Sequence, residues 1–188
     1  MALTDSLISY WKLDDATGQF PVDATASGNT LNQGNTITSG TGKINGGASF
    51  SGSGTWLSCL NTADLQLSDV DFTFALWIKL NATAADMWPI SKGAVGNSSL
   101  ILEFKAGPTQ RFRLRMFGSA GFGNETSVQA DTFGAPSTGT YYYVVAWHDA
   151  TANTFDIQIN DTAADSASDA LGVLSETGNL KSNSRPAK

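Results

Sequence analysis

The sequence predicts an all-β protein, a two-sheet antiparallel jelly-roll sandwich that forms a single domain over residues 1–188. Several short runs alternate apolar and polar residues with the period of two that is typical of a half-buried strand. The connections between them are rich in Gly, Ser, Thr and Asn, and 19 glycines suit many tight turns. No convincing amphipathic helix separates these runs. Together the three observations favour a sandwich or jelly roll.

The first half of the chain contains four expected strands, at Leu7–Leu13, Ala48–Phe50, Trp56–Leu60 and Phe72–Leu80. Residues 14–47 are polar and glycine-rich, and we expect long loops there with one short strand. The fourth run is the clearest strand. In it, the apolar residues Phe72, Phe74, Leu76, Ile78 and Leu80 alternate with Thr73, Ala75, Trp77 and Lys79.

A hairpin follows, with strands Leu100–Lys105 and Arg111–Phe117 around the loop Ala106–Gln110. The loop length sets the register of the two strands. The expected apolar pairs are Phe104–Phe112, Leu102–Leu114 and Leu100–Met116. On the opposite face Glu103 meets Arg113, and Lys105, Arg111 and Arg115 lie beside them.

A second hairpin is expected between Tyr141 and Asn160, with its loop at Asp149–Asn153. With this loop, the expected inner pairs are Trp147–Phe155, Val145–Ile157 and Tyr143–Ile159. The other face then carries Tyr142, His148, Asp156, Gln158 and Asn160. Side chains of these types bind sugars by hydrogen bonds and ring contacts. After Asn160 the chain turns polar and has no strong strand pattern.

Composition and charge exclude several function classes. The net charge of −6 and the pI of about 4.5 argue against nucleic-acid binding, which needs a strongly basic surface, and disfavour binding to anionic membranes. No apolar run approaches the ~18–20 residues of a membrane-spanning helix. Cys59 is the only cysteine, so no intrachain disulfide can form. Its strand context indicates a small buried hydrophobe rather than a reactive thiol.

Several segments, taken in order, resemble one known family. They are Ser9–Asp14, Asp23 with Ser27–Asn29, Gly42–Ala48 leading to Phe50–Gly52, Phe72–Lys79, Ile90–Gly93, Thr140–Val145 and Ile157–Asn160. Over about residues 7–180 the chain resembles the laminin-G-like domains of the concanavalin A-like lectin/glucanase superfamily. The resemblance implies a two-sheet jelly roll that mainly binds glycans or proteins and sometimes holds a structural calcium ion. Fold alone does not fix the ligand.

The chain departs from this family at its C-terminal end. Family members usually close with a further strand pair that includes an acidic, then hydrophobic, run, and no such run precedes Lys188. We therefore expect a domain that lacks the closing C-terminal strands. Either the domain is shortened or another chain completes it, and the second alternative predicts a homo-oligomer or a larger assembly.

The sequence lacks the pattern of paired carboxylates that catalysis in this superfamily needs. Glucanases of the superfamily carry two or three carboxylates spaced along one strand, and glycoside hydrolysis needs two carboxyl groups across the scissile bond. Glu103 stands alone in its strand, and Asp156 and Asp161 would point to opposite faces. His148 is the only histidine, which excludes a cluster of histidine ligands. We therefore expect that the protein is not an enzyme.

Glycan binding needs aromatic platforms beside amide and carboxylate groups. The candidate ligand-binding residues are Trp77, Trp88, Arg113, Arg115, Tyr142, His148, Asp156, Gln158 and Asn160. Trp88, before Pro89, is expected in a loop. Two alternatives stay open. Loops could cover Trp77, and the arginine stripe could be a solvated face neutralised by Glu103 rather than a surface for acidic sugars or a partner.

Calcium is the one cofactor that the sequence suggests. Calcium takes carboxylate, amide and carbonyl oxygens from loops, and Asp23 and Asn29 lie in a segment that matches the family. These two residues are the candidate metal ligands. The alternative is that Asp23 caps a turn.

The combined pattern predicts a non-enzymatic jelly-roll module on the surface of a bacteriophage virion, as a capsid decoration or fibre protein that contacts glycans. The strands begin within seven residues of Met1 without an export signal, and the opening run resembles phage-associated laminin-G-like proteins. The expected partners are glycans or virion proteins, and the expected location is the virion surface after synthesis in the host cytoplasm. The alternatives are a free-standing lectin-like module of a bacterial protein and a degenerate glycoside hydrolase.

Overall fold

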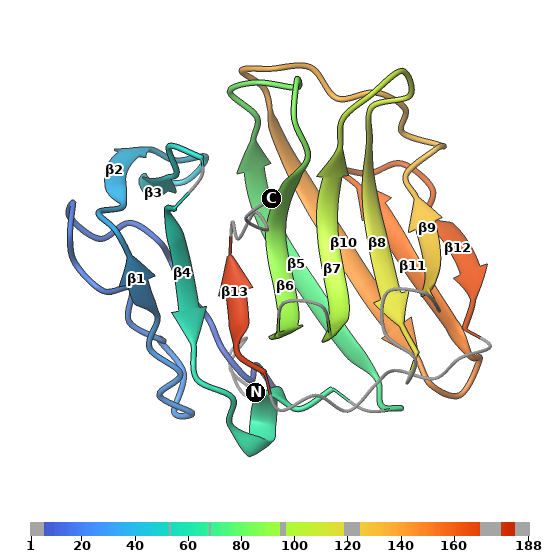
Figure 1. The fold of residues 1–188 in the computed structure, drawn as a ribbon, viewed down its shortest axis with the longest axis horizontal. Helices are drawn as coiled ribbons and strands as arrows, with labels where there is room; N and C mark the ends of the chain where they lie inside the picture. The colour runs from blue at the N-terminus through green and yellow to red at the C-terminus, as the bar shows by residue number, and fades with distance from the viewer. Residues whose placement is uncertain are drawn as a thin grey trace.

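Two antiparallel sheets face each other across a hydrophobic core, which confirms the predicted all-β sandwich of jelly-roll type (Figure 1). The computed structural model describes residues 6–52, 54–67, 69–94, 97–118, 125–169 and 178–182. Most of the sequence segments between the strands are turns or irregular loops, as their Gly, Ser and Asn content predicts.

Within the described residues, the larger sheet has seven strands, in the order β1 (Asn32–Gly34), β4 (Trp56–Cys59), β13 (Leu180–Ser182), β6 (Met87–Ala94), β7 (Asn97–Lys105), β8 (Arg111–Phe117) and β9 (Glu125–Gln129). The smaller sheet has four, in the order β12 (Asp165–Ser168), β11 (Thr154–Ile159), β10 (Tyr141–Asp149) and β5 (Phe72–Lys79). A two-stranded ribbon pairs β2 (Thr38–Thr41) with β3 (Gly46–Ser49), and one 3-10 turn, η1, spans Ala63–Leu65.

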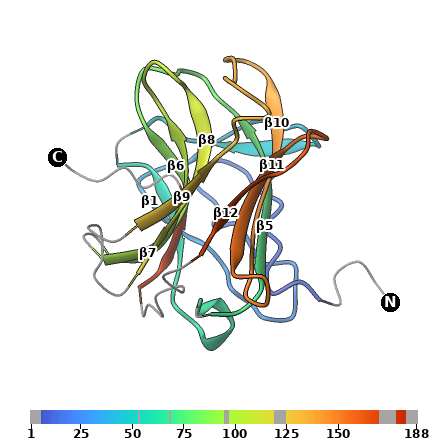
Figure 2. The same ribbon diagram turned by 90° about the vertical axis from the view of Figure 1, so that its right-hand side faces the viewer.

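The main core lies between the inner faces of the two sheets. Figure 2 shows the two layers from one end, with β6–β9 on one side and β5, β10, β11 and β12 on the other. The largest contributions come from Leu100, Leu102, Phe104, Phe112, Leu114, Met116, Tyr142, Val144, Phe155, Ile157 and Ile159. Phe112 packs edge-on against Tyr142 with ring centroids 5.8 Å apart, which joins the larger sheet to the smaller one.

Two predicted elements are confirmed in detail. The β7–β8 hairpin has the expected register, with Phe104 opposite Phe112 and Glu103 opposite Arg113. Strand β5 alternates as predicted, since Phe74 is partly buried against the core while Trp77 is exposed. In both elements one face is apolar and the other carries mostly polar, small or charged residues, so the hydrophobic pattern selects one face for the core.

The register of the β10–β11 hairpin differs from the prediction by one residue on β10. Val144 pairs with Ile159, Ala146 with Ile157 and His148 with Phe155. The inner face of β10 therefore carries Tyr142, Val144, Ala146 and His148, and the predicted inner residues Tyr141, Tyr143, Val145 and Trp147 lie on the outer face. The inner face of β11 is buried as predicted.

The cause of this difference is the turn. Strand β10 continues through Asp149, which pairs with Thr154, so the loop begins one residue later than predicted. Asp149 Oδ1 accepts hydrogen bonds from Thr151 N at 2.9 Å and Ala152 N at 2.8 Å, and Asn153 has a φ of 52°. A shift of one residue moves every side chain of a strand to the other face. Because both faces of β10 are largely apolar, hydrophobicity alone does not select between the two registers.

Strand β13 was not predicted from the sequence. It lies in the middle of the larger sheet, between β4 and β6 (Figure 1), where Leu180 pairs with both Cys59 and Lys92. The Lys92 side chain is fully buried, and its ammonium donates hydrogen bonds to Asn61 Oδ1 and the Gly178 carbonyl. The C-terminal stretch thus supplies a central strand to the larger sheet.

A second hydrophobic cluster lies at the β1–β4–β13 end of the larger sheet. Its buried members are Leu31, Ile37, Leu57, Cys59, Leu65 and Leu180. Cys59 is buried as expected, and burial is the main cause that raises the pKa of its thiol. Trp11 and Leu13 pack against this cluster from the N-terminal segment.

The predicted strand at Leu7–Leu13 is wrong. Within the described residues, this segment makes a single β-bridge, between Trp11 and Asp23, and Leu13 has a φ of 59° that breaks the extended conformation. In the part of the chain that the structure describes, no helix is long and apolar enough to cross a membrane.

The register of β10 makes a direct prediction for two neighbouring tyrosines. Tyr142 is 5% exposed and Tyr143 is 36% exposed. We expect Tyr142→Ala to lower the free energy of unfolding by about 3–5 kcal/mol because it leaves a cavity in the core. The matched variant Tyr143→Ala is expected to cost under about 1 kcal/mol, and the comparison is made by urea denaturation. Equal costs would contradict the register.

Candidate functional site

The outer face of the smaller sheet carries a group of aromatic side chains. We call Trp77, Tyr141, Tyr143 and Trp147 the aromatic face. The strand register places Trp77 directly beside Tyr143, and Thr73 beside Trp147. The rings of Trp77 and Tyr143 lie 5.1 Å apart, and Trp77 is 42% exposed. The alternative that loops cover Trp77 is therefore wrong.

Polar side chains of β11 border the aromatic face. Asp156 pairs with Trp147 and Gln158 pairs with Val145, so both point to the outer side. Gln158 Nε2 donates to the Thr162 carbonyl at 2.6 Å, and Asp156 Oδ2 accepts from Thr154 Oγ1 at 3.2 Å. These contacts hold an amide and a carboxylate beside the rings. The structure thus brings Trp77, Asp156 and Gln158, all predicted site residues, onto one surface.

Asn160 follows β11 at the end of the same hairpin. It has a φ of 56°, and its Oδ1 accepts a hydrogen bond from Tyr143 N at 3.0 Å. Its own backbone N–H donates to the Tyr143 carbonyl at 2.7 Å. These bonds fix the backbone under Tyr143, so Asn160 positions the aromatic face from the end of the sheet.

The β2–β3 ribbon borders the other end of the aromatic face. The Tyr141 hydroxyl donates to the Thr41 carbonyl, which ties the ribbon to β10. Lys43, in the turn of the ribbon, places its ammonium 5.3 Å from the centre of the Trp77 ring. Lys79 places its ammonium 4.7 Å from the centre of the Tyr141 ring. Both are cation–π contacts at distances that stabilise the pair.

Two predicted ligand-binding residues lie in the core instead. Tyr142 is buried, and its hydroxyl accepts a hydrogen bond from Ser137 N at 2.8 Å. His148 is 2% exposed and stacks on Phe72. Its Nδ1 lies 2.9 Å from the Val70 carbonyl, and its Nε2 lies 3.2 Å from Asp169 Oδ2. The prediction that Tyr142 and His148 lie on the solvent face is wrong because of the register shift on β10.

Trp88 was expected in a loop and lies instead in β6 of the larger sheet, where it is half-buried. The pairing of β6 with β7 shifts between Met87 and Ile90, which is typical of a β-bulge. Pro89 lies within this irregular region, and it gave the sequence its loop-like character. Trp88 belongs to a different sheet from the aromatic face.

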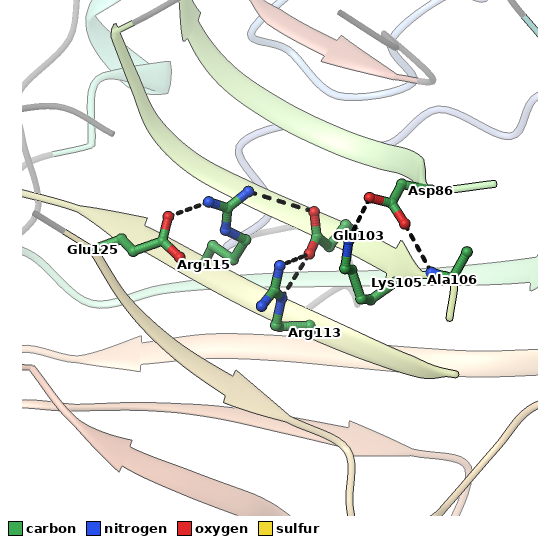
Figure 3. Close-up of polar contacts among 7 residues, drawn as sticks. All are labelled: Asp86, Glu103, Lys105, Ala106, Arg113, Arg115 and Glu125. Carbon is green, nitrogen blue, oxygen red and sulfur yellow. Dashed lines mark hydrogen bonds and ion pairs between the residues drawn. The ribbon is translucent and has the colours of Figure 1, made fainter. Parts of the chain in front are cut away.

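The arginine stripe on the outer face of the larger sheet is engaged in ion pairs. Figure 3 shows the network, in which Glu103 lies between Arg113 and Arg115, and Arg115 also contacts Glu125. Arg113 Nε donates to Glu103 Oε1 at 2.6 Å. Four charges of alternating sign sum to zero, which favours the neutralised face over an anion-binding stripe.

A second pair extends this network toward the end of β7. Lys105 Nζ lies 2.7 Å from Asp86 Oδ2, and Ala106 N donates to Asp86 Oδ1 at 2.9 Å (Figure 3). Burial alone would raise the pKa of the Asp86 carboxyl, but these contacts outweigh it and hold the pKa below its usual value.

Glu103 is the carboxylate that the sequence singled out in a strand, and a sugar cannot reach it. It is 1% exposed and covered by the two arginines. A glycosidase needs two carboxyl groups that face the substrate across open space. The geometry around Glu103 therefore gives no support to the alternative of a glycoside hydrolase.

Asp23 and Asn29, the candidate calcium ligands, lie in one hydrogen-bonded loop. Asp23 accepts bonds from Tyr10 N at 2.9 Å, Thr25 N at 2.9 Å and Asn29 N at 3.0 Å. Burial alone would raise the pKa of Asp23, but these donors outweigh it and lower the pKa. Its oxygens thus cap the turn and anchor the N-terminal segment.

Asn29 links the same loop to its neighbours. Its Nδ2 donates to Ser9 Oγ at 2.9 Å, and its carbonyl accepts a bond from Trp11 Nε1 at 2.7 Å. Among the described residues, no group of three or more His, Cys, Asp or Glu side chains is arranged to hold a metal ion. The loop fits the turn-capping alternative, and calcium binding stays a prediction.

The sequence pattern missed five residues of this surface: Lys43, Lys79, Tyr141, Tyr143 and Trp147. Lys79 was assigned to the correct face of its strand, but its position beside Tyr141 depends on the pairing of β5 with β10. The three aromatic residues of β10 were placed in the core by the register error. One signal was present, since eight residues from Tyr141 include four aromatic rings and His148, more than one strand face can bury.

No protein-family model matches the chain, and no characterised protein matches its sequence. Its fold is similar to several solved structures. The binding domain of Paraclostridial Mosquitocidal Protein 1 superposes with a TM-score of 0.68 at 13% identity, over 92% of this chain and 45% of that chain. The receptor binding domain of botulinum neurotoxin D gives 0.66 at 13% identity, over 91% and 45%.

A third similar structure is the binding domain of botulinum neurotoxin serotype G, with a TM-score of 0.66 at 14% identity, over 87% of this chain and 40% of that chain. This chain thus spans less than half the length of each structure. At such low identity the similarity establishes the β-rich sandwich fold. These neighbours are binding domains rather than catalytic domains.

The Glu103 network predicts an asymmetric pair of variants. Glu103→Gln leaves Arg113 and Arg115 without their buried counter-charge, and we expect it to lower the free energy of unfolding by about 3 kcal/mol. Glu125→Gln removes a carboxylate whose side chain is 31% exposed, and we expect it to cost under about 1 kcal/mol. Urea midpoints measure both. If Glu103→Gln costs no more than Glu125→Gln, the central role of Glu103 is wrong.

Asp23 predicts the acid limb of stability. The usual pKa of the group is 3.8, and the folded state lowers it. The contribution of Asp23 is therefore complete above about pH 4 and is lost as the pH falls through the lower folded-state value. We expect Asp23→Asn to be less stable than wild type at pH 6 and to lose less stability between pH 5 and pH 2.5.

Thermal unfolding at a series of pH values measures this difference. Asp64→Asn is the control, because the Asp64 side chain is exposed in η1. An unchanged acid limb in Asp23→Asn would show that Asp23 does not carry this dependence.

Proposed function

We propose that this chain is a non-enzymatic glycan-binding module and that the aromatic face is its binding surface. The observation that carries the proposal is the exposed pair of Trp77 and Tyr143. Large aromatic side chains are normally buried, and an exposed group of them usually marks a contact surface. Here the rings lie on a sheet, where the backbone holds them in fixed positions.

The chemistry of the surface suits a sugar. A pyranose ring has an apolar face of C–H groups that packs on an aromatic ring, and hydroxyl groups around its rim that need hydrogen-bond partners. Gln158 and Asp156 lie beside the rings and offer an amide and a carboxylate. The rings lie on the outer face of a sheet, with Trp77 and Tyr143 exposed, which fits an extended or chain-internal glycan better than a small molecule that needs a deep pocket.

The solved structures of similar fold support a binding role, since each is named as a binding domain. The finer assignments drawn from the sequence have other grounds. The laminin-G-like resemblance, the bacteriophage virion surface and assembly with virion proteins or further copies rest on the sequence segments alone and stay predictions. The free-standing lectin-like module uses the same surface, so both readings share one test.

The test is a glycan array followed by titration calorimetry with the best ligand. We expect Trp77→Ala and Tyr143→Ala each to weaken binding at least about tenfold, which corresponds to about 1.4 kcal/mol. Trp56→Ala is the matched control. Trp56 also has a lysine above its ring, since Lys181 lies 5.9 Å from the ring centre, but it belongs to the larger sheet.

Circular dichroism and melting temperatures establish that each variant is folded. Glycan binding that survives Trp77→Ala and Tyr143→Ala in folded protein would overturn the placement of the site. Absence of any glycan ligand would overturn the function itself.

A further inference from the structure

The lysines beside the aromatic face lack the ion pairs that most cations of the larger sheet make among the described residues. The protein is acidic, with a net charge of −6. Most cations of the larger sheet are neutralised, because Lys105, Arg111, Arg113 and Arg115 each lie in an ion pair. These cations are committed to partners within the chain.

Lys43 and Lys79 differ from these four cations in their contacts. Both are exposed, and among the described residues neither lies in an ion pair with a carboxylate. Both are held on the aromatic face, since Lys43 lies over Trp77 and Lys79 lies over Tyr141. Two unneutralised ammonium groups therefore border one aromatic platform in an otherwise acidic protein.

Two acidic residues, Asp71 and Asp149, lie at the opposite end of the same sheet. Lys79 pairs with Tyr141 at the start of β10, while Asp149 pairs with Thr154 at its end. At about 3.4 Å per residue these ends are roughly 27 Å apart. Asp149 accepts bonds from the turn amides and Asp71 accepts one from Ala150 N at 2.9 Å, so both are occupied by the backbone. The two ammonium groups thus lie at the end of the face that is far from Asp71 and Asp149.

We propose that the glycan bound by the aromatic face is anionic and that Lys43 and Lys79 bind its carboxylate or sulfate group. This inference rests on the proposed function. A lysine ammonium is a compact point charge that pairs with either anion. The Trp77 and Tyr143 rings would receive the sugar ring next to that charge, and Trp77 keeps 42% exposure with Lys43 in place. The anionic group then lies at the β2–β3 end of the sheet.

The net charge of the whole protein does not favour an anionic ligand. A net charge of −6 repels polyanions at long range, so anionic ligands gain no general attraction. Affinity for an anionic glycan would depend on the two local lysines, and screening by salt would weaken it. A neutral glycan of the same shape would bind through the rings alone and would be insensitive to salt.

The experiment compares matched pairs of oligosaccharides by titration calorimetry. The first pair is a uronic-acid oligosaccharide and its carboxyl-reduced neutral form, and the second is a sulfated oligosaccharide and its desulfated form. We expect wild type to bind the anionic member of at least one pair at least tenfold more tightly at 50 mM salt. The preference is expected to shrink at 500 mM salt. The pair that shows it identifies carboxylate or sulfate as the group.

Two variants assign the effect to residues. We expect Lys43→Gln with Lys79→Gln to remove the preference for the anionic member. Lys181→Gln is the control, because Lys181 also lies over a tryptophan ring, Trp56, on the larger sheet. All three lysines lie at the surface or half-buried, so melting temperatures check that the fold is retained.

The outcomes separate the two proposals. Equal affinity for both members of each pair, with loss of binding in Trp77→Ala, overturns the anionic ligand and keeps the glycan-binding function. An anionic preference that persists in the double lysine variant overturns the role of Lys43 and Lys79. No binding of any member, on this panel and on the array, overturns both proposals.

Discussion

Burial of one face of β10 in the core is the constraint on which the rest of the structure depends. Val144 and Ala146 pack against the larger sheet, together with Tyr142, whose ring meets Phe112. Since side chains alternate along a strand, burying these residues forces Tyr143 and Trp147 outward. Side chains alternate in the same way along strand β5, so Trp77 points to the same outer side as Tyr143. The core therefore creates the aromatic face as a consequence of its own packing.

The sequence predicts correctly the strands in which one face is apolar and the other is mostly polar. The β7–β8 hairpin was predicted to the residue because leucine and phenylalanine alternate there with Glu103 and arginine. Strand β10 was predicted as a strand with the wrong face inward, because both of its faces are largely apolar. Its turn decides the register, through Asp149 and Asn153. The hydrophobic pattern predicts the wrong register for a strand whose outer face is as apolar as its inner face. In β10 that outer face is the candidate site.

Other features were missed because they depend on contacts far apart in the chain. Strand β13 has only three residues, which lie between polar neighbours and show no hydrophobic periodicity. It forms because Leu180 pairs with Cys59 on one side and with Lys92 on the other. One short strand was predicted within residues 14–47, where the structure has β1 and β2, and β9 and β12 were not predicted. These short strands pair with their neighbours in the sheets. For the site, Asp156 and Gln158 could be assigned from alternation within β11. Lys43 could not, because its position over Trp77 requires the ribbon to fold back against the smaller sheet.

The two outer faces of the sandwich differ in how their charges are paired, and the proposed binding surface lies on the smaller sheet. On the larger sheet, Glu103 is buried between two arginines, and the charges satisfy one another within the chain. Such a face gains order from its own contacts and offers little to a ligand. Over the smaller sheet, the ammonium groups of Lys43 and Lys79 lie over the rings of Trp77 and Tyr141 without a carboxylate partner among the described residues. A lysine that is held in place without a carboxylate partner in the chain can pair with an anionic group of a ligand. The proposed ligand-binding surface is therefore the face whose lysines lack a carboxylate partner among the described residues.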